Sequence, residues 1–407
     1  MEYEERRCLN ADGAMFVKAR LMTPGPTQVA EATRLLMATS HPHHRSAAFT
    51  RLFVRMLGRL KWLWDTSGDV LFVTGSGTAG MEAAMQGALR PGDRLLAVTG
   101  GKFAERWVEL GRQLGCEVTT LEVAYGASAN PEALSALLAA QPAFDALVLV
   151  ASETSTGALH PVAELVGCFR SVAPEAIVLV DGITAVGCVD LSMERDGIDL
   201  LVSGTQKSFG VPPGGAMVGI GPRGWQALAR PGGYHAMSLD LRGERKQATA
   251  GDSAFTPAVP LILALDEVME RWHEAGREAL FAHQAALSAG TIAAVKALGL
   301  SLFADHPSPA LTSILPPAGI RADDLIATMR DRYGVTITGG QDSLKGKILR
   351  IGHLGAVDAM DIVATVTALE CALADHGFAV SPGAAAAAAI AAMTPQLRSA
   401  TNAIYQP

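Results

Sequence analysis

The sequence predicts an α/β protein: a large domain built on a seven-stranded, mainly parallel sheet, followed by a small α/β domain. Between residues 69 and 220, short and almost wholly apolar runs alternate with amphipathic runs at helical spacing. Strands that are apolar on both faces and separated by helices form parallel sheets covered on both sides. A second, shorter alternation of strand and helix patterns after a long helical stretch predicts the small domain.

The boundaries of each expected element follow from the local pattern of apolar residues. In mainly parallel sheets of this kind, ligands bind beyond the carboxyl ends of the strands. The expected strands of the large sheet are 69–74, 94–99, 117–123, 145–151, 176–180, 199–202 and 216–220. Helices are expected over 29–39, 47–64, 79–89, 103–114, 131–140 and 162–172. In the small domain we expect strands over 300–303, 311–314, 335–338 and 347–351, and helices over 322–332 and 359–375.

The domain boundaries follow from changes in composition. Residues 1–20 are a mixed polar arm, and a Pro/Gly turn then opens the large domain, 21–265. A helical stretch over 260–289 bridges the two domains, so the second segment, 266–378, contains this bridge and the small domain. Residues 379–407 are an alanine-rich, low-complexity tail, for which a short helix and a mobile end are both possible.

Charge and composition exclude several classes of protein. The formal net charge of −7 argues against a nucleic-acid partner. No run of 18 apolar residues is present, and the N-terminus lacks the apolar core of a signal peptide, so we expect a cytoplasmic protein without a membrane span. The five cysteines have no CxxC spacing and indicate free thiols in a reducing compartment, with no metal site.

Lys207 is the most informative residue of the chain. It follows an apolar strand and precedes a Pro-Pro-Gly-Gly segment, and no other charged residue lies between positions 200 and 222. Burial lowers the pKa of a lysine and frees a nucleophilic amine, which Schiff-base chemistry requires. A loop lysine that points into water is the commoner explanation for a single lysine of this kind.

Three other strand ends carry polar groups. Residues 74–78, Thr-Gly-Ser-Gly-Thr, precede a helix and predict a phosphate cradle, although an ordinary strand–helix turn has the same pattern. Asp181 ends an apolar strand and suits a pyridinium nitrogen, or else it caps the turn. The hydroxyls of residues 153–157 suit a ring oxygen or a phosphate, or a helix-entry turn. The conjunction of these groups is far more specific than any one of them.

In this order the motifs resemble those of the class V, fold-type I pyridoxal-phosphate aminotransferases, above all the alanine–glyoxylate and serine–pyruvate branch. The resemblance covers about residues 21 to 378. Its motifs are Thr23–Pro26, Gly75–Thr78 with Met81–Ala84, Gly101–Phe103 with Arg106 and Trp107, Glu153–Gly157, Val180–Gly182, Ser203–Lys207 with Pro212–Gly214, Phe255–Pro257 and Leu349–Gly352.

The resemblance implies a role for each matching residue. Lys207 would hold pyridoxal 5'-phosphate as a Schiff base, and Asp181 would pair with the pyridine nitrogen. Thr154 would lie near the ring oxygen or the substrate, and Thr256 would reach a phosphate in the neighbouring subunit, which implies a homodimer with shared sites. The phosphate would be held by Ser76, Gly77, Thr78 and Gln206.

Three further positions carry alternatives. Phe103 falls where the family stacks an aromatic ring on the cofactor, but with Trp107, Leu110 and Leu114 it also forms a helical stripe of the kind that is usually core. We assign Phe103 to the stacking and Trp107 onward to the core. Arg350 lies on an alternating strand, on the face opposite Leu349 and Ile351, and would clamp a substrate carboxylate; Pro26 would also bind the substrate.

The implied activity is transfer of an amino group from a small amino acid, of the alanine or serine type, to glyoxylate or pyruvate. A cysteine-desulfurase-type lyase would need a thiol on a mobile loop, whereas Cys371 lies in a helical pattern. Pyridoxamine, an aminophosphonate or aspartate remain possible donors. The chain departs from the family at Gly100 and at Ser253, and the segment from His43 to Arg45 partly matches a His–Arg pair that would line the substrate entrance. A polar loop, rather than a metal site, explains these histidines.

Overall fold

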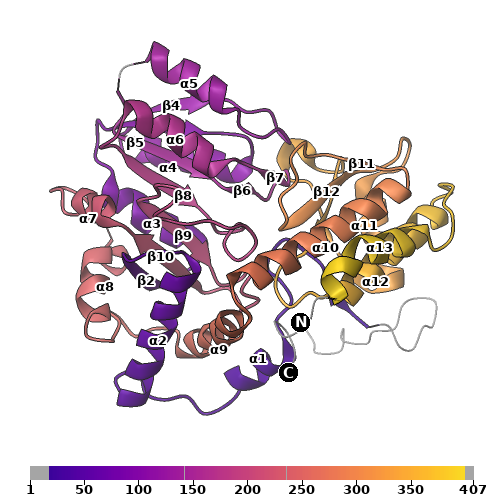
Figure 1. The fold of residues 1–407 in the computed structure, drawn as a ribbon, viewed down its shortest axis with the longest axis horizontal. Helices are drawn as coiled ribbons and strands as arrows, with labels where there is room; N and C mark the ends of the chain where they lie inside the picture. The colour runs from indigo at the N-terminus through magenta and orange to yellow at the C-terminus, as the bar shows by residue number, and fades with distance from the viewer. Residues whose placement is uncertain (1–17, 142, 235, 399–407) are drawn as a thin grey trace, which may run out of the picture.

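A computed structural model describes residues 18–141, 143–234 and 236–398 and confirms the predicted seven-stranded sheet (Figure 1). All pairs are parallel except those of β10, which runs antiparallel to both of its neighbours. In spatial order the strands are β2 (Asp69–Thr74), β10 (Gly215–Ile220), β9 (Leu200–Gly204), β8 (Ile177–Asp181), β5 (Ala146–Val150), β3 (Arg94–Val98) and β4 (Glu117–Leu121).

Helices cover both faces of this sheet, because its strands are apolar on both sides. One face packs against α3 (Gly77–Ala88), α4 (Lys102–Gln113), α7 (Pro222–Leu228) and α8 (Leu241–Ala248). The other packs against α2 (Ala47–Leu63), α5 (Pro131–Ala140), α6 (Val162–Val172) and α9 (Val259–Ala275), and α1 (Glu31–Met37) lies against α9. In β8, Ile177 and Leu179 face the α3–α4 side, so strand alternation turns Asp181 to that side as well.

The small sheet is antiparallel and lies beyond α10 in Figure 1. Its order is β11 (Ser301–Leu302), β12 (Leu311–Leu315), β15 (Leu349–Gly352) and β14 (Thr338–Gly339). Its apolar core includes side chains of α10 (Arg277–Ala297), α11 (Ala322–Tyr333), α12 (Ala359–Asp375) and α13 (Ala384–Arg398). The strand β1 (Arg20–Leu21) pairs with β13 (Val335–Thr336), so the chain first contacts the small domain before it enters the large sheet.

The structure differs from the expected elements in several places, and the helices α7 and α8 and a short hairpin over residues 152–159 were not expected. The long helical stretch is two helices, since Gly276, with φ of +88°, ends α9 and begins α10. The strand expected over 335–338 is divided between β13 and β14. The alanine-rich segment contains the helix α13, one of the two possibilities that the sequence left open; it packs against α10 and α12 and buries Met393, whereas residues 399–407 lie outside the described part.

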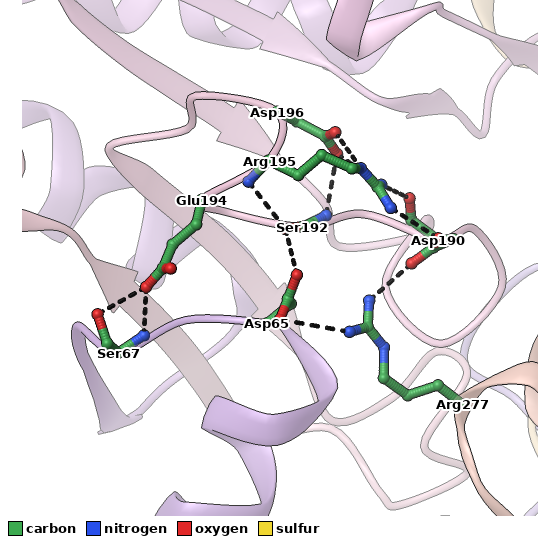
Figure 2. A network of polar contacts seen from close by, with 8 residues as sticks. All are labelled: Asp65, Ser67, Asp190, Ser192, Glu194, Arg195, Asp196 and Arg277. Carbon is green, nitrogen blue, oxygen red and sulfur yellow. Dashed lines mark hydrogen bonds and ion pairs between the residues drawn. The ribbon is translucent and has the colours of Figure 1, made fainter.

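A polar network fixes the connection between β8 and β9 (Figure 2). Arg277, the first residue of α10, pairs with Asp190 at 2.6 Å and with Asp65 at 3.7 Å, and Ser192 Oγ donates to Asp65 at 2.7 Å. The network therefore ties the loop that leads towards β9 to the end of α2 and the start of α10. Its members are Asp65, Ser67, Asp190, Ser192, Glu194, Arg195, Asp196 and Arg277.

Within the described residues, no helix is both long and apolar enough to cross a membrane.

Candidate active site

The carboxyl ends of the central strands surround a cavity of about 220 Å³. Eight residues assigned to the site from the sequence line it together: Pro26, Gly77, Thr78, Phe103, Thr154, Asp181, Gln206 and Lys207. The remaining lining residues were not assigned to the site: Gly25, Arg106, Trp107, Val150, Ser152, Ile183, Thr184 and Pro213. Chain segments that are distant in the sequence thus meet at one edge of the sheet, as the parallel topology requires.

Lys207 is buried, with 8% of its surface exposed. Its Nζ donates to the carbonyl of Pro24 at 2.6 Å, and Thr27 Oγ1 donates to its backbone carbonyl at 2.8 Å. Burial is the main cause that lowers its pKa to about 8, and the charge of Arg350 adds to this effect while Asp181 opposes it. At pH 7 roughly one amine in ten is then neutral, against roughly one in three thousand for an unperturbed lysine.

Asp181 is also buried, and both of its oxygens accept hydrogen bonds. Oδ1 accepts from the backbone N–H of Ile183 and Oδ2 accepts from the indole N–H of Trp107, each at 2.9 Å. Burial raises the pKa of Asp181 to about 6 against these two bonds. The bond to Ile183 is a turn cap, so the two explanations offered by the sequence for this carboxylate are compatible with one another.

The phosphate cradle predicted from the sequence is the first turn of α3. Ser76 is the N-cap and accepts from Ala79 N at 3.4 Å, and the helix begins at Gly77, earlier than expected. A Cβ at Gly77 would lie 2.7 Å from Ile183 Cδ1, so a larger residue here would displace the side chain of Ile183 in the loop after β8. Gln206 lines the same cavity, and its Oε1 is buried and has no hydrogen-bond partner among the described residues. Unpaired N–H groups and the positive end of the helix dipole suit an anion here.

Phe103 and Arg106 form one side of the cavity. The guanidinium of Arg106 lies 4.8 Å from the centre of the Phe103 ring, and Lys207 Nζ lies 6.0 Å from it. Trp107 was assigned to the core because of its helical stripe, and 2% of its surface is exposed, but its indole also lines the cavity and binds Asp181. Its spacing of four residues from Phe103 is the sequence signal that places both on one helix face.

Arg350 lies on the side of β15 that faces the large domain, where 4% of its surface is exposed. Nη1 donates to the carbonyl of Thr154 at 2.7 Å and Nε to that of Gly339 at 2.8 Å. Burial lowers its pKa to about 10. The hydroxyl of Thr154 shares a hydrogen bond of 2.7 Å with Thr184. The guanidinium is therefore held by the carbonyls of Thr154, which lines the cavity, and of Gly339, which does not. Arg350 itself is not among the residues that line the cavity, and it has no carboxylate partner among the described residues.

Other residues singled out from the sequence do not reach this cavity. Thr256 is exposed and lies outside the lining of the site in its own chain. Arg45 forms an ion pair with Asp252, and the rings of His43 and His44 lie 4.5 Å apart at the surface. Within the described part of the chain, no three His, Cys, Asp or Glu side chains are grouped as metal ligands would be.

The residues of the cavity fit pyridoxal phosphate. A helix N-terminus with unpaired N–H groups, together with the side-chain amide N–H₂ of Gln206 in the same cavity, suits the phosphate. A buried carboxylate suits the ring nitrogen, and a buried amine of lowered pKa suits the aldehyde. Together with the seven-stranded sheet, this arrangement defines a fold-type I enzyme that uses pyridoxal phosphate.

Comparison with known proteins gives the family. The sequence model of the family Aminotransferase class-V matches residues 27–357, and the chain belongs to this family. It is 38% identical to the small subunit of the soluble hydrogenase of Synechococcus, over 91% of this chain and 97% of that protein. It is 32% identical to the L-aspartate–glyoxylate aminotransferase of Paracoccus denitrificans, over 91% of this chain and 94% of that protein.

Among solved structures, the chain is similar to the subgroup IV aspartate aminotransferase of Thermus thermophilus. The TM-score is 0.82 and the identity 33%, and the match covers 88% of this chain and 99% of the other. The protein is therefore an aminotransferase with pyridoxal phosphate as its cofactor, and its substrates are an amino donor and a 2-oxo acid.

Proposed function

We propose that this enzyme transfers the amino group of a small amino acid, of the alanine or serine type, to glyoxylate or pyruvate. The observation that carries the proposal is the buried Lys207 amine, with its lowered pKa, in the same 220 Å³ cavity as Asp181 and the start of α3. The Paracoccus relative, whose name includes glyoxylate, supports that acceptor.

Each side chain of the cavity has a separate role in the proposed reaction. When bound, pyridoxal phosphate supplies the aldehyde that receives the amino group and a ring that withdraws electrons from Cα. Asp181 holds the proton on the ring nitrogen, and Gln206 and the first N–H groups of α3 hold the phosphate. Lys207 Nζ would act as the base that takes the proton from Cα of the amino acid and as the acid that gives it back, which a neutral amine of lowered pKa can do.

Arg350 and Phe103 orient the reactants. We propose that Arg350 binds the α-carboxylate with two parallel hydrogen bonds, since its guanidinium lacks a carboxylate partner among the described residues. Phe103 stacks on the cofactor ring, and Pro26 and Thr154 border the substrate. With the carboxylate fixed, the Cα–H bond is held in line with Lys207, so the arginine contributes to turnover as well as to affinity.

We also propose a cytoplasmic homodimer with shared active sites. Thr256 is exposed, as a residue that completes the phosphate site of a partner would be, and the neighbouring Phe255 exposes 45% of its apolar surface, which supports a subunit contact here. Sedimentation equilibrium tests this proposal. A monomer with full cofactor occupancy would contradict it.

Turnover of purified protein with a panel of donors tests the activity. The donors are alanine, serine, aspartate, pyridoxamine and an aminophosphonate, each with glyoxylate, pyruvate or 2-oxoglutarate, and Lys207→Ala is the control. We expect the fastest turnover with alanine or serine and glyoxylate. Turnover with aspartate alone would refute the donor class, and turnover that survives Lys207→Ala would refute the mechanism. Among the described cysteines, Cys371 is the one in the small domain, and it lies within α12 rather than on a loop, which does not favour a desulfurase.

A further inference from the structure

The start of α4 is capped by another element of the chain. The N-cap is Gly101, which has no side chain to accept a hydrogen bond from the first turn. Instead, Glu153 on the hairpin strand β6 (Ser152–Glu153) accepts from Ala104 N at 3.1 Å and from Phe103 N at 3.5 Å. The hydroxyl of Ser155 accepts from Lys102 N at 3.0 Å. Three N–H groups of the first turn are thus satisfied from the hairpin.

The carboxylate of Glu153 is wholly buried, and its remaining bonds are local. Ser155 donates to Oε1 through its backbone N–H at 3.0 Å and its hydroxyl at 2.6 Å. Burial raises the pKa of Glu153, while these four bonds and the positive end of the helix dipole favour its charged form. A Cβ on Gly101 would lie 2.3 Å from Glu153 Cγ, so the glycine leaves the space that the carboxylate occupies.

The same hairpin also holds Arg350. The residue next to Glu153 is Thr154, whose carbonyl accepts from Arg350 Nη1 at 2.7 Å, and the hairpin closes where Glu153 pairs with Ala158 on β7 (Ala158–Leu159). One rigid turn therefore contacts the helix start that carries Phe103 and the guanidinium on the small domain. A displacement of Glu153 would move both groups relative to Lys207.

We propose that Glu153 is a positioning residue: it fixes the positions of the Phe103 ring and the Arg350 guanidinium relative to each other and to the cofactor. The inference rests on the proposed roles of those two residues. It adds a buried carboxylate that does not line the cavity and acts through the N-terminus of α4 and the carbonyl of Thr154.

The variant Glu153→Gln tests the positioning role of Glu153. It replaces one carboxylate oxygen by an N–H₂ group, which cannot accept a hydrogen bond from the backbone N–H groups that face it. The matched control is Glu370→Gln. Glu370 is a buried glutamate of α12 that accepts from Gly383 N at 2.6 Å and Ala385 N at 2.9 Å, at the start of α13 and away from the cavity. A second variant, Gly101→Ala, keeps the charge of Glu153 and displaces it sterically, and its φ of 172° suits any residue.

Three readouts separate the possibilities: amide exchange of each protein without added cofactor, the dissociation constant of pyridoxal phosphate, and the induced circular dichroism of the bound cofactor. In Glu153→Gln and Gly101→Ala, we expect exchange over residues 102–104 to quicken by roughly tenfold, on the scale of a lost charge-assisted bond. We expect the dissociation constant to rise by a similar factor and the dichroism to fall. In Glu370→Gln only exchange near residues 383–385 should quicken.

Unchanged exchange over residues 102–104 in both variants would overturn the capping itself. Faster exchange with a cofactor affinity and dichroism equal to those of Glu370→Gln would show that Glu153 is only structural, and would overturn the positioning role. The exchange readout needs no cofactor, so its outcome is independent of the proposed function. A failure of that function would be seen separately, in wild-type protein that forms no covalent link at Lys207.

Discussion

Replacing Trp107 by phenylalanine removes one of the two donors that Asp181 accepts, and the consequence can be calculated. A hydrogen bond to a charged group contributes roughly 1.5–3 kcal/mol. About 1.4 kcal/mol corresponds to one pKa unit, so losing a hydrogen bond of about 1.5 kcal/mol should raise the pKa of Asp181 by about one unit. The starting value is about 6, because burial outweighs both hydrogen bonds. In Trp107→Phe the carboxyl group should therefore titrate near 7.

The cofactor requires the ionised carboxylate, so binding must release a proton below the pKa of Asp181, and affinity falls as the pH falls. Between pH 8 and pH 6, the loss of affinity in Trp107→Phe should exceed that of the wild type by about fivefold, which follows from a one-unit difference in pKa. The affinity of each protein at pH 6 is compared with its own affinity at pH 8. Any loss of cofactor affinity that comes from the smaller side chain in Trp107→Phe and does not depend on pH then cancels.

The assay is titration of the protein without cofactor, followed by absorbance of bound pyridoxal phosphate. Trp64→Phe is the matched control, since Trp64 is buried and its indole N–H has no hydrogen-bond partner among the described residues. We expect the control to follow the wild type. A pH dependence of Trp107→Phe within twofold of the wild type, or an equal change in Trp64→Phe, would refute this account of Asp181.

Two further predictions concern the neighbours of the cofactor. Arg350→Lys should keep cofactor absorbance but lose roughly 2–4 kcal/mol of transition-state stabilisation for amino acids, because lysine lacks the planar fork; donors without a carboxylate should be unaffected. Arg90→Lys, at a buried arginine that also donates to backbone carbonyls, is the control, and an equal loss on both donor types would contradict the clamp. Gly25→Ala places a Cβ 2.6 Å from Lys207 Cδ and should slow covalent attachment of the cofactor, as followed by absorbance. Gly92→Ala, at a φ of +87° with open space around it, isolates backbone strain; equal rates in the two variants would contradict the steric explanation.

The sequence was sufficient for the large sheet because its signals are local. Each strand is a short apolar run, and each strand end carries its polar group within a few residues, so parallel topology alone predicts that Lys207 and Asp181 lie close together. The break at Gly276 was missed, because a single glycine interrupts neither the apolar spacing nor the length of the helical pattern.

Contacts that depend on side-chain direction could not be predicted. The helical spacing of Trp107 predicts a core residue and does not reveal whether its indole N–H has a partner. Its hydrogen bond to Asp181 exists because Asp181 faces α4, and the sequence pattern does not show this. Arg350 was assigned to the face opposite Leu349 and Ile351 by alternation, but its burial depends on the hairpin at Thr154, which is almost two hundred residues away. Position along the chain says little about such contacts.

The central claim is that Lys207 carries the cofactor. Borohydride reduction of the yellow protein, followed by peptide mapping with mass spectrometry, tests it most directly. We expect the reduced pyridoxyl group on Lys207, and we expect Lys207→Ala to bind the cofactor without a covalent link. A label on another lysine, such as Lys102 beside Phe103 at the start of α4, would contradict the assignment of the site.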